Sequence, residues 1–394
     1  MNNSHEAKPA APRFKAVYVK IAVITLNTLV ILLLLNLSLA VFFHFQDTKT
    51  GRKHTGSYRE KNADLDAYTT VSKVEANRFL DEQKSMQKKG FAYKPWVQFA
   101  NPHFDGHLLT TDTSGFRVTP GSIDRDPPVL VHVFGGSTTF GYGVPNSYTI
   151  PSQLQQSLNK RQLGKAFVVK NYGQGYYYSS QEILLFISVL KSGNIPKYAV
   201  FVDGANDTAL LSKGVDQPYF TEIISEAWDL KNGRVEKPSR IPMIRLAQQV
   251  LGRTKSPPAD QKDRSVLPEA DAARYVVDRY RQNQRIIRAL CKEYDVVPIF
   301  VWQPVPFFKY DRSLHPFRYA DQGPKLWGMV YEDMARSSDL DFLYLGDMLD
   351  GVSEKVFVDA IHYNEKYNGL IAQAIAERIA RDNDIGVNGK IASQ

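Results

Sequence analysis

Ser137 is the first residue whose type and surroundings could do chemistry, because a serine hydroxyl can act as a nucleophile. It lies in residues 134–141 (FGGSTTFG), directly after two glycines. Glycines adopt backbone angles that other residues avoid, so a tight turn here could expose the hydroxyl and leave the backbone N–H free. A Gly-rich turn with a capping serine is the alternative interpretation. A phosphate-binding loop does not fit, because the Gly-Lys-Ser/Thr ending is missing.

His362 lies late in the chain, three residues after Asp359. Among the eight histidines, it alone has a carboxylate at this spacing where a loop is expected to meet a helix. Its imidazole could take the proton of a serine, while the carboxylate fixes the tautomer and stabilises the imidazolium. A capping aspartate beside a surface histidine is the alternative.

Two more positions could donate hydrogen bonds to a reacting oxygen. Gly173 could use its backbone N–H, and Asn206, within residues 203–207 (DGAND), could use its side-chain amide. Both patterns also occur in ordinary turns. Each position follows a β-rich run, as Ser137 does, so the question is whether a fold brings them together.

Short β-rich runs alternate with longer helical stretches from residue 91 onward. Strands are expected at residues 129–134, 166–170, 198–202, 296–301 and 342–345. Helices are expected near residues 148–162, 179–192, 272–294, 324–337 and 365–381. This alternation predicts right-handed βαβ units and a parallel sheet with helices on both faces. In such sheets ligands bind at the carboxyl ends of the strands, where Ser137, Gly173 and Asn206 would lie.

Taken in chain order, the four blocks resemble those of the SGNH (GDSL-like) hydrolase family. The blocks are Gly135-Gly136-Ser137, Gly173, Gly204-Ala205-Asn206-Asp207 and Asp359-Ala360-Ile361-His362. The resemblance covers roughly residues 125–382. It implies an α/β fold of three α/β/α layers, with a central parallel five-stranded sheet of flavodoxin-like type.

The resemblance also implies a role for each matching residue. Ser137 would be the nucleophile, His362 the general base and Asp359 its partner. The backbone N–H groups of Ser137 and Gly173, with the side chain of Asn206, would form the oxyanion hole. One position departs from the family pattern: Gly136 stands where an aspartate is usual, although the triad does not need that aspartate.

Residues 21–46 contain no Asp, Glu, Lys or Arg. A helix of this length exceeds the hydrocarbon thickness of about 30 Å, which predicts an uncleaved transmembrane anchor. A cleaved signal peptide could end at Ser38-Leu39-Ala40, but the apolar run continues beyond it. Basic residues flank both ends, so charge does not decide the orientation. The layout of a signal anchor predicts a cytosolic tail and an extracytoplasmic domain on the bacterial inner membrane.

The resulting organisation has four parts. They are a tail (1–20), the anchor (21–46), a juxtamembrane linker and helix (47–90) and the hydrolase-like domain (91–394) with an insertion (208–270). An insertion of this length could form a lid over the site. Aromatic side chains in residues 91–117 could stack on sugar rings, but a role in covering the sheet edge is the preferred interpretation.

Composition limits the remaining partners. The net charge is +8, yet Lys and Arg are scattered rather than gathered with aromatic side chains, so nucleic acid is not expected. Cys291 is the single cysteine and cannot form an intramolecular disulfide. No cluster has metal-ligand spacing, so neither a metal nor a cofactor is expected.

The sequence therefore predicts a membrane-anchored serine esterase that removes O-acyl groups, O-acetyl above all, from an extracytoplasmic glycan. The same acyl-enzyme would serve an O-acyltransferase for an exported polysaccharide, because both reactions share their first half. A lipid esterase or thioesterase and a non-catalytic assembly subunit with this fold are further alternatives. Membrane-protein partners stay open.

Overall fold

The computed structural model describes residues 11–49, 63–121, 128–161, 163–225, 242–250, 267–315 and 324–391. The chain divides into two units, residues 1–54 with 225–265 and residues 55–224 with 266–394. We describe each unit by itself.

The first unit contains helix α1 (Ala11–Lys49) and helix α8 (Pro242–Val250). Phe14–Phe43 of α1 is long and apolar enough to cross a membrane by length and composition. The backbone N–H of Met243 in α8 donates to Asn36 Oδ1 of α1 at 3.1 Å.

Helix α1 begins before the predicted anchor. Residues 11–20, which were predicted as the tail, are helical and belong to α1, while the division into tail and anchor stays a prediction. Lys and Arg are good helix formers, and their long side chains can reach water from a helix end, so the charges there do not stop the helix. Residues 1–10 lie outside the described part of the chain.

The second unit is built on a parallel five-stranded sheet with the order β6-β5-β7-β8-β9. The strands are β5 (Val129–Gly135), β6 (Phe167–Asn171), β7 (Tyr198–Asp203), β8 (Val297–Trp302) and β9 (Phe342–Tyr344). Each lies within one or two residues of its predicted bounds. The chain order reverses at β5, which has β6 on one side and β7 on the other. A crevice at the carboxyl ends of β5 and β7 is therefore the expected ligand position.

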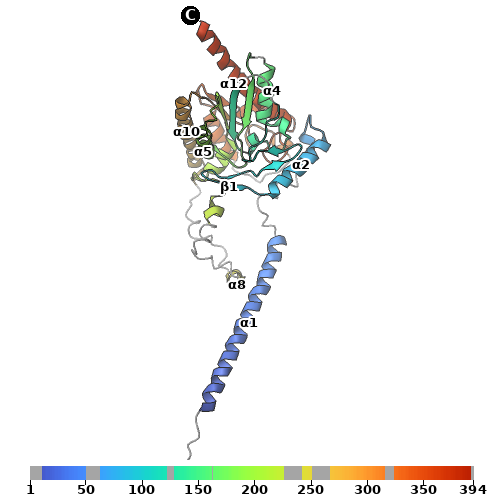
Figure 1. Cartoon of the computed structure of the whole chain (residues 1–394), viewed down its shortest axis with the longest axis vertical. Helices are drawn as coiled ribbons and strands as arrows, with labels where there is room; N and C mark the ends of the chain where they lie inside the picture. The colour runs from blue at the N-terminus through green and yellow to red at the C-terminus, as the bar shows by residue number, and fades with distance from the viewer. Residues whose placement is uncertain are drawn as a thin grey trace, which may run out of the picture. The chain divides into compact units, whose positions relative to one another are not determined.

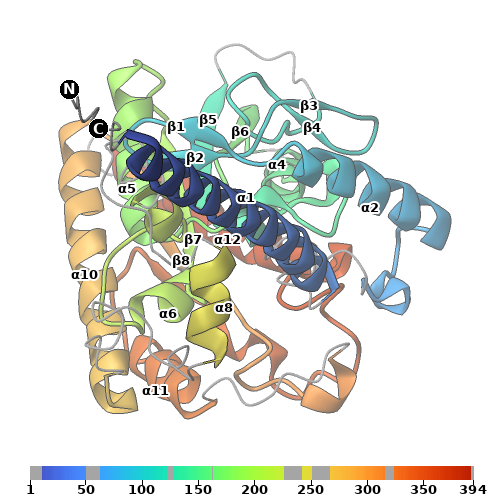
Figure 2. The ribbon, with the colours of Figure 1, turned by 90° about the horizontal axis from the view of Figure 1, so that it is seen from below.

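Helices cover both faces of this sheet. They are α3 (Ser137–Phe140), α4 (Ile150–Lys160), α5 (Ser179–Lys191), α6 (Ala205–Leu211), α10 (Glu269–Glu293), α11 (Pro324–Met334) and α12 (Glu365–Ile391). α4 and α12 lie on one face, and α5 and α10 lie on the other (Figures 1 and 2). The predicted three-layer class with a central five-stranded sheet is confirmed.

Strand alternation explains why both faces need a cover. Val131, Val133 and Val200 point toward α4 and α12, whereas Phe134 and Phe201 point toward α5 and α10. Apolar residues on both sides of each strand are typical of a sheet that is buried on both faces.

The segment before the sheet contains helix α2 (Lys73–Lys88) and two short hairpins, β1 (Ala92–Lys94) with β2 (Gln98–Ala100) and β3 (Phe104–Asp105) with β4 (Thr110–Thr111). Phe99 is buried and packs against Tyr177, as expected for residues that cover the domain. Tyr93 and Trp96 are instead 73% and 83% exposed. Some aromatic side chains of this segment, such as Phe99, therefore cover the domain as predicted, whereas Tyr93 and Trp96 do not.

The insertion was predicted to begin at residue 208, but residues 208–211 belong to α6, which ends at Leu211. Helix α8 lies within the expected insertion. Residues 226–241 and 251–266 lie outside the described residues, so the lid stays a prediction.

Candidate active site

Ser137 is the first residue of α3, directly after the carboxyl end of β5. The turn needs glycine at position 135, where φ is +156° and a Cβ atom would lie 2.1 Å from the Thr139 hydroxyl. Ser137 is nearly buried, and within the described chain its backbone N–H has no acceptor. The start of a helix thus leaves a donor beside the hydroxyl.

The structure brings the predicted serine, histidine and aspartate together. His362 Nε2 lies 2.7 Å from Ser137 Oγ, and His362 Nδ1 lies 2.7 Å from Asp359 Oδ2. His362 is fully buried. An Nδ1–H donated to Asp359 leaves Nε2 as the acceptor for the serine proton.

Asp359 is fixed by its own turn. Its Oδ1 accepts the backbone N–H groups of Ile361 and His362, both at 3.0 Å. The ring of Tyr142 lies edge-on to the His362 ring, with centroids 5.5 Å apart. The imidazole is therefore held from one side by a carboxylate and contacted on another by an aromatic ring.

Asn206 lies in the first turn of α6, after Gly204 with φ +121°. Its Nδ2 donates to the Tyr177 carbonyl at 2.6 Å, which uses one of the two amide hydrogens. A Cβ atom at Gly136 would lie 2.4 Å from this Nδ2. The Asn206 amide therefore lies against the residue before Ser137, and no side chain, aspartate included, fits at Gly136 without a shift.

Gly173 is also placed beside α3, because a Cβ atom there would lie 2.3 Å from the Phe140 nitrogen. Its N–H already donates to Asn171 Oδ1 at 2.9 Å, so its part in an oxyanion hole stays a prediction. Gly175 lies two residues further on, and its N–H has no acceptor in the described structure. The sequence signal for Gly175 was the second glycine of residues 171–175 (NYGQG).

Gln174 is a site-loop residue that sequence analysis did not single out. Its Oε1 accepts both the backbone N–H and the side-chain amide of Asn101, at 2.7 and 2.9 Å. Its Nε2 donates to the Gly115 carbonyl at 3.0 Å. Gln174 thus joins the loop after β6 to the segment before the sheet. No local pattern marks a contact between residues so far apart in the chain.

Three carboxyl groups are buried around the Asn206 turn, those of Glu182, Asp203 and Asp207. Burial raises the pKa of all three, and it raises that of Asp207 to about 6. Besides burial, the negative charge of Asp203 raises the pKa of Glu182, and that of Asp207 raises the pKa of Asp203. The Ser179 hydroxyl donates to Asp207. The three carboxyl groups come from α5, the last residue of β7 and α6, so the cluster is built on the elements beside Asn206.

This cluster predicts a stability that falls as the pH rises. The folded protein holds these protons more tightly than the unfolded chain, where the pKa of Asp207 returns to about 3.8. The free energy of unfolding should fall from about pH 4 through about pH 6, by about 1.4 kcal/mol per pH unit for each retained proton. Glu182 and Asp203 extend this window upward, because their pKa values are raised further.

The Glu182→Gln variant checks this expectation by scanning calorimetry at pH 5 and pH 8. It should gain stability over the wild type at pH 8 and gain less at pH 5, with each 1 kcal/mol raising Tm by about 2–4 °C. Glu332, which lies outside the cluster, provides the control variant Glu332→Gln. An equal difference from the wild type at both pH values would contradict the prediction.

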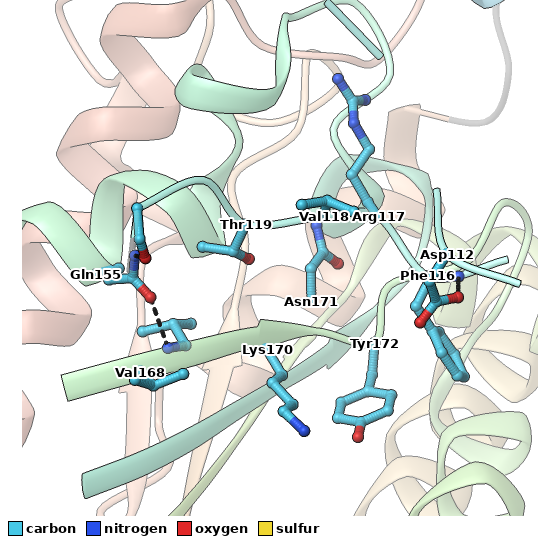
Figure 3. A pocket seen from close by; sticks show the side chains of 12 residues that line it. Asp112, Phe116, Arg117, Val118, Thr119, Gln155, Val168, Lys170, Asn171 and Tyr172 are labelled. Carbon is cyan, nitrogen blue, oxygen red and sulfur yellow. Dashed lines mark hydrogen bonds between the residues drawn. The ribbon is translucent and has the colours of Figure 1, made fainter. Parts of the chain in front are cut away.

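Two cavities lie near the strand ends. The larger, about 300 Å³, is lined by residues 116–119, Gln155 of α4 and the edge strand β6 (Figure 3). Gln155 Oε1 accepts the Val169 N–H at 3.0 Å and so caps the edge of β6. Its lining does not include Ser137 or His362.

The smaller cavity has a volume of about 70 Å³. Its lining includes Met86, Phe91, Tyr142 and Tyr176. Tyr142 is the same residue whose ring contacts His362. Tyr142 therefore contacts both the mostly apolar cavity and the His362 imidazole.

No family model matches the sequence, and no curated protein matches it. Solved structures that are similar include a lipolytic G-D-S-L family protein from Veillonella parvula, at 13% identity over 63% of this chain and 97% of that chain (TM-score 0.36). A carbohydrate acetylesterase family member from Sinorhizobium meliloti is 14% identical over 65% of this chain and 98% of that chain (TM-score 0.35). An acetyl xylan esterase is 11% identical over 63% and 98% of the two chains (TM-score 0.35). The function proposed below is argued from the geometry of the site.

Proposed function

We propose that the protein is a membrane-anchored serine esterase of the SGNH type that removes O-acyl groups, O-acetyl above all, from an extracytoplasmic glycan. The single observation that carries the proposal is the hydrogen-bonded chain from Ser137 through His362 to Asp359, at 2.7 Å in both steps. An activated serine of this kind serves acyl transfer on many folds, and it is recognised by its geometry.

The reaction follows from these positions. Ser137 Oγ attacks the ester carbonyl carbon while His362 Nε2 takes its proton, and Asp359 stabilises the imidazolium. The negative oxygen of the tetrahedral intermediate accepts hydrogen bonds from the Ser137 N–H and the second Asn206 amide hydrogen. His362 returns the proton to the leaving alcohol, which breaks the ester bond and leaves the acyl group on Ser137. Water then attacks the acyl-enzyme by the same route and releases the acid.

The small cavity supports a glycan substrate rather than a particular acyl group. Neither Ser137 nor His362 lines it, so its volume sets no limit on the length of the acyl chain. Its walls Phe91, Tyr142 and Tyr176 give aromatic surfaces of the kind that pack against sugar rings, and Tyr142 also contacts His362.

The test uses the full chain in detergent with p-nitrophenyl acetate and p-nitrophenyl octanoate. We expect Ser137-dependent hydrolysis with higher kcat/KM for the acetate. Preference for the octanoate would favour the lipid esterase, and rates equal to those of Ser137→Ala with both esters would reject the proposed activity. An O-acetylated polysaccharide then separates two outcomes by mass spectrometry: loss of acetyl into water supports the esterase, whereas transfer to an added glycan supports the acyltransferase.

A further inference from the structure

A short segment far from Ser137 and His362 in the sequence is hydrogen-bonded to the loops that carry both residues. We propose that Asp64–Val71, which we name the strap, positions the nucleophile and the base relative to each other. The inference rests on the proposed function, and it concerns residues that touch no reacting atom. In the sequence the strap follows α1 after residues 50–62, which lie outside the described chain.

The strap forms hydrogen bonds with the residues just before Asp359 and with the residues just after His362. Before these residues, the Asp64 N–H donates to the Val358 carbonyl at 2.7 Å, and Asp64 Oδ2 pairs with Lys355 Nζ at 2.7 Å. After them, Asn364 Nδ2 donates to the Ala67 carbonyl of the strap at 2.8 Å. Asp359 and His362 therefore lie in a loop whose two ends are both held by bonds to the strap.

Glu365 makes the largest number of these bonds. It is the first residue of α12, three residues after His362, and it is almost fully buried. Its Oε1 accepts the Thr69 and Val71 N–H groups at 2.6 and 3.0 Å, the Thr69 hydroxyl at 3.1 Å and the Thr70 N–H. A carboxylate oxygen that accepts several backbone N–H groups makes charge-assisted bonds, which are stronger than neutral ones.

The strap also reaches the loop that follows the nucleophile. The Tyr68 hydroxyl donates to the Gly143 carbonyl at 2.5 Å. Gly143 lies close to the other loop, because a Cβ atom there would be 2.4 Å from Val358 Cγ2. The strap residues Ala67, Tyr68 and Val71 pack into one apolar cluster with Val144 and Val358.

One short segment therefore contacts the loop after Ser137 and the loop around His362. The distance between Ser137 Oγ and His362 Nε2 depends on how these two loops sit against each other. Proton transfer needs that distance within hydrogen-bond reach, and a misplacement of about 1 Å can cost about 10²-fold in rate. Loosening the strap should lower kcat more than it changes KM, because the described strap hydrogen bonds go to the two loops and not to the side chains of Ser137, Asn206 or His362.

Glu365→Ala and Glu365→Gln form the test pair in the full chain. Alanine removes the acceptor, whereas glutamine keeps one oxygen that can accept the same bonds. In the described structure all of the bonds go to Oε1, and Oε2 has no partner. Glu82→Ala is a matched control, because the Glu82 carboxylate also accepts three successive backbone N–H groups, those of residues 107–109, in a loop that does not carry a triad residue.

We expect Glu365→Ala to lower the kcat of p-nitrophenyl acetate hydrolysis about 10- to 100-fold. The kcat is calculated per active site, and active sites are counted by titration with a phosphonate. Glu365→Gln should restore most of kcat, and Glu82→Ala should keep the wild-type kcat even where its Tm falls as far. If Glu365→Ala does not fold, Tyr68→Phe, which removes a single hydroxyl, should lower kcat in the same direction. Wild-type kcat in the folded strap variants, or an equal loss in Glu82→Ala, would overturn the inference.

A second readout separates this inference from the proposed activity. The Nδ1 proton of His362, bonded to Asp359, should give a downfield NMR signal that His362→Gln removes. Glu365→Ala should shift or broaden this signal, and Glu82→Ala should leave it unchanged. A wild type without esterase activity would reject the proposed function, while an unchanged signal in Glu365→Ala would reject the strap.

Discussion

Replacing Ser137 with alanine should lower the kcat of ester hydrolysis at least about 10³-fold, because the nucleophile that forms the acyl-enzyme is lost. The residual rate would come from the donors that stabilise the oxyanion and from substrate binding. The hydroxyl is hydrogen-bonded to His362 Nε2 and alanine removes only this one oxygen atom, so the change should leave the fold intact. The measurement is steady-state hydrolysis of p-nitrophenyl acetate by the full chain, beside the thermal midpoint of each variant.

Ser147 provides the matched serine control, because it is exposed in the 3-10 turn before α4. Ser147→Ala should hydrolyse the ester at the wild-type rate and react with a fluorophosphonate probe as the wild type does. Ser137→Ala should not react with the probe. A Ser137→Ala protein that folds and keeps wild-type turnover would show that the ester is processed elsewhere.

Asp359→Asn should lower kcat by about 10⁴-fold with the fold preserved. Asparagine keeps an oxygen that can accept the Ile361 and His362 N–H groups, so the turn can survive. Its amide then donates to His362 Nδ1, which places the ring proton on Nε2. An Nε2–H faces Ser137 Oγ and cannot accept the serine proton, so the base is lost through the wrong tautomer.

The matched control for this substitution is Asp112→Asn. Asp112 Oδ1 likewise accepts two backbone N–H groups in its own turn, from Ser114 and Phe116 at 2.8 and 2.9 Å, and it is exposed at the surface. We expect wild-type kcat from Asp112→Asn. The triad assignment would be wrong if Asp359→Asn and Asp112→Asn had the same kcat.

The sheet could be predicted from the sequence because its strands are short, apolar runs separated by helical periods. A run such as residues 198–202 is apolar on both sides, and this pattern is local in the chain. The signals that start a helix also lie within a few residues of its end. Helix α4 begins after Thr149, whose side chain accepts the Ser152 N–H, and Pro151 lies in its first turn. Helix α1 begins at Ala11, before the apolar span, because charged residues can continue a helix beyond such a span.

The positions of Ser137, Asn206 and His362 could also be predicted, since each lies where a strand ends or a helix begins. Parallel strands place their carboxyl ends at one edge, so residues that follow β5 and β7 must lie near each other. This topological rule explains why Ser137 and Asn206 were found without any knowledge of their contacts. For Gly173 the rule predicted the loop, but not which N–H in that loop has a partner.

The elements, the edge of the sheet that carries the site and the residue types available there can all be derived from local sequence patterns. The contacts that set the geometry come from packing in three dimensions. They are the amide of Asn206 against Gly136, the carboxyl cluster around Asp207, and Glu365 on the strap. The physical reason is the separation along the chain over which each kind of interaction acts. Secondary structure follows from periodicity and caps within a few residues, whereas a buried hydrogen bond depends on distances between segments far apart in the chain, such as Thr69 and Glu365, which only packing brings together.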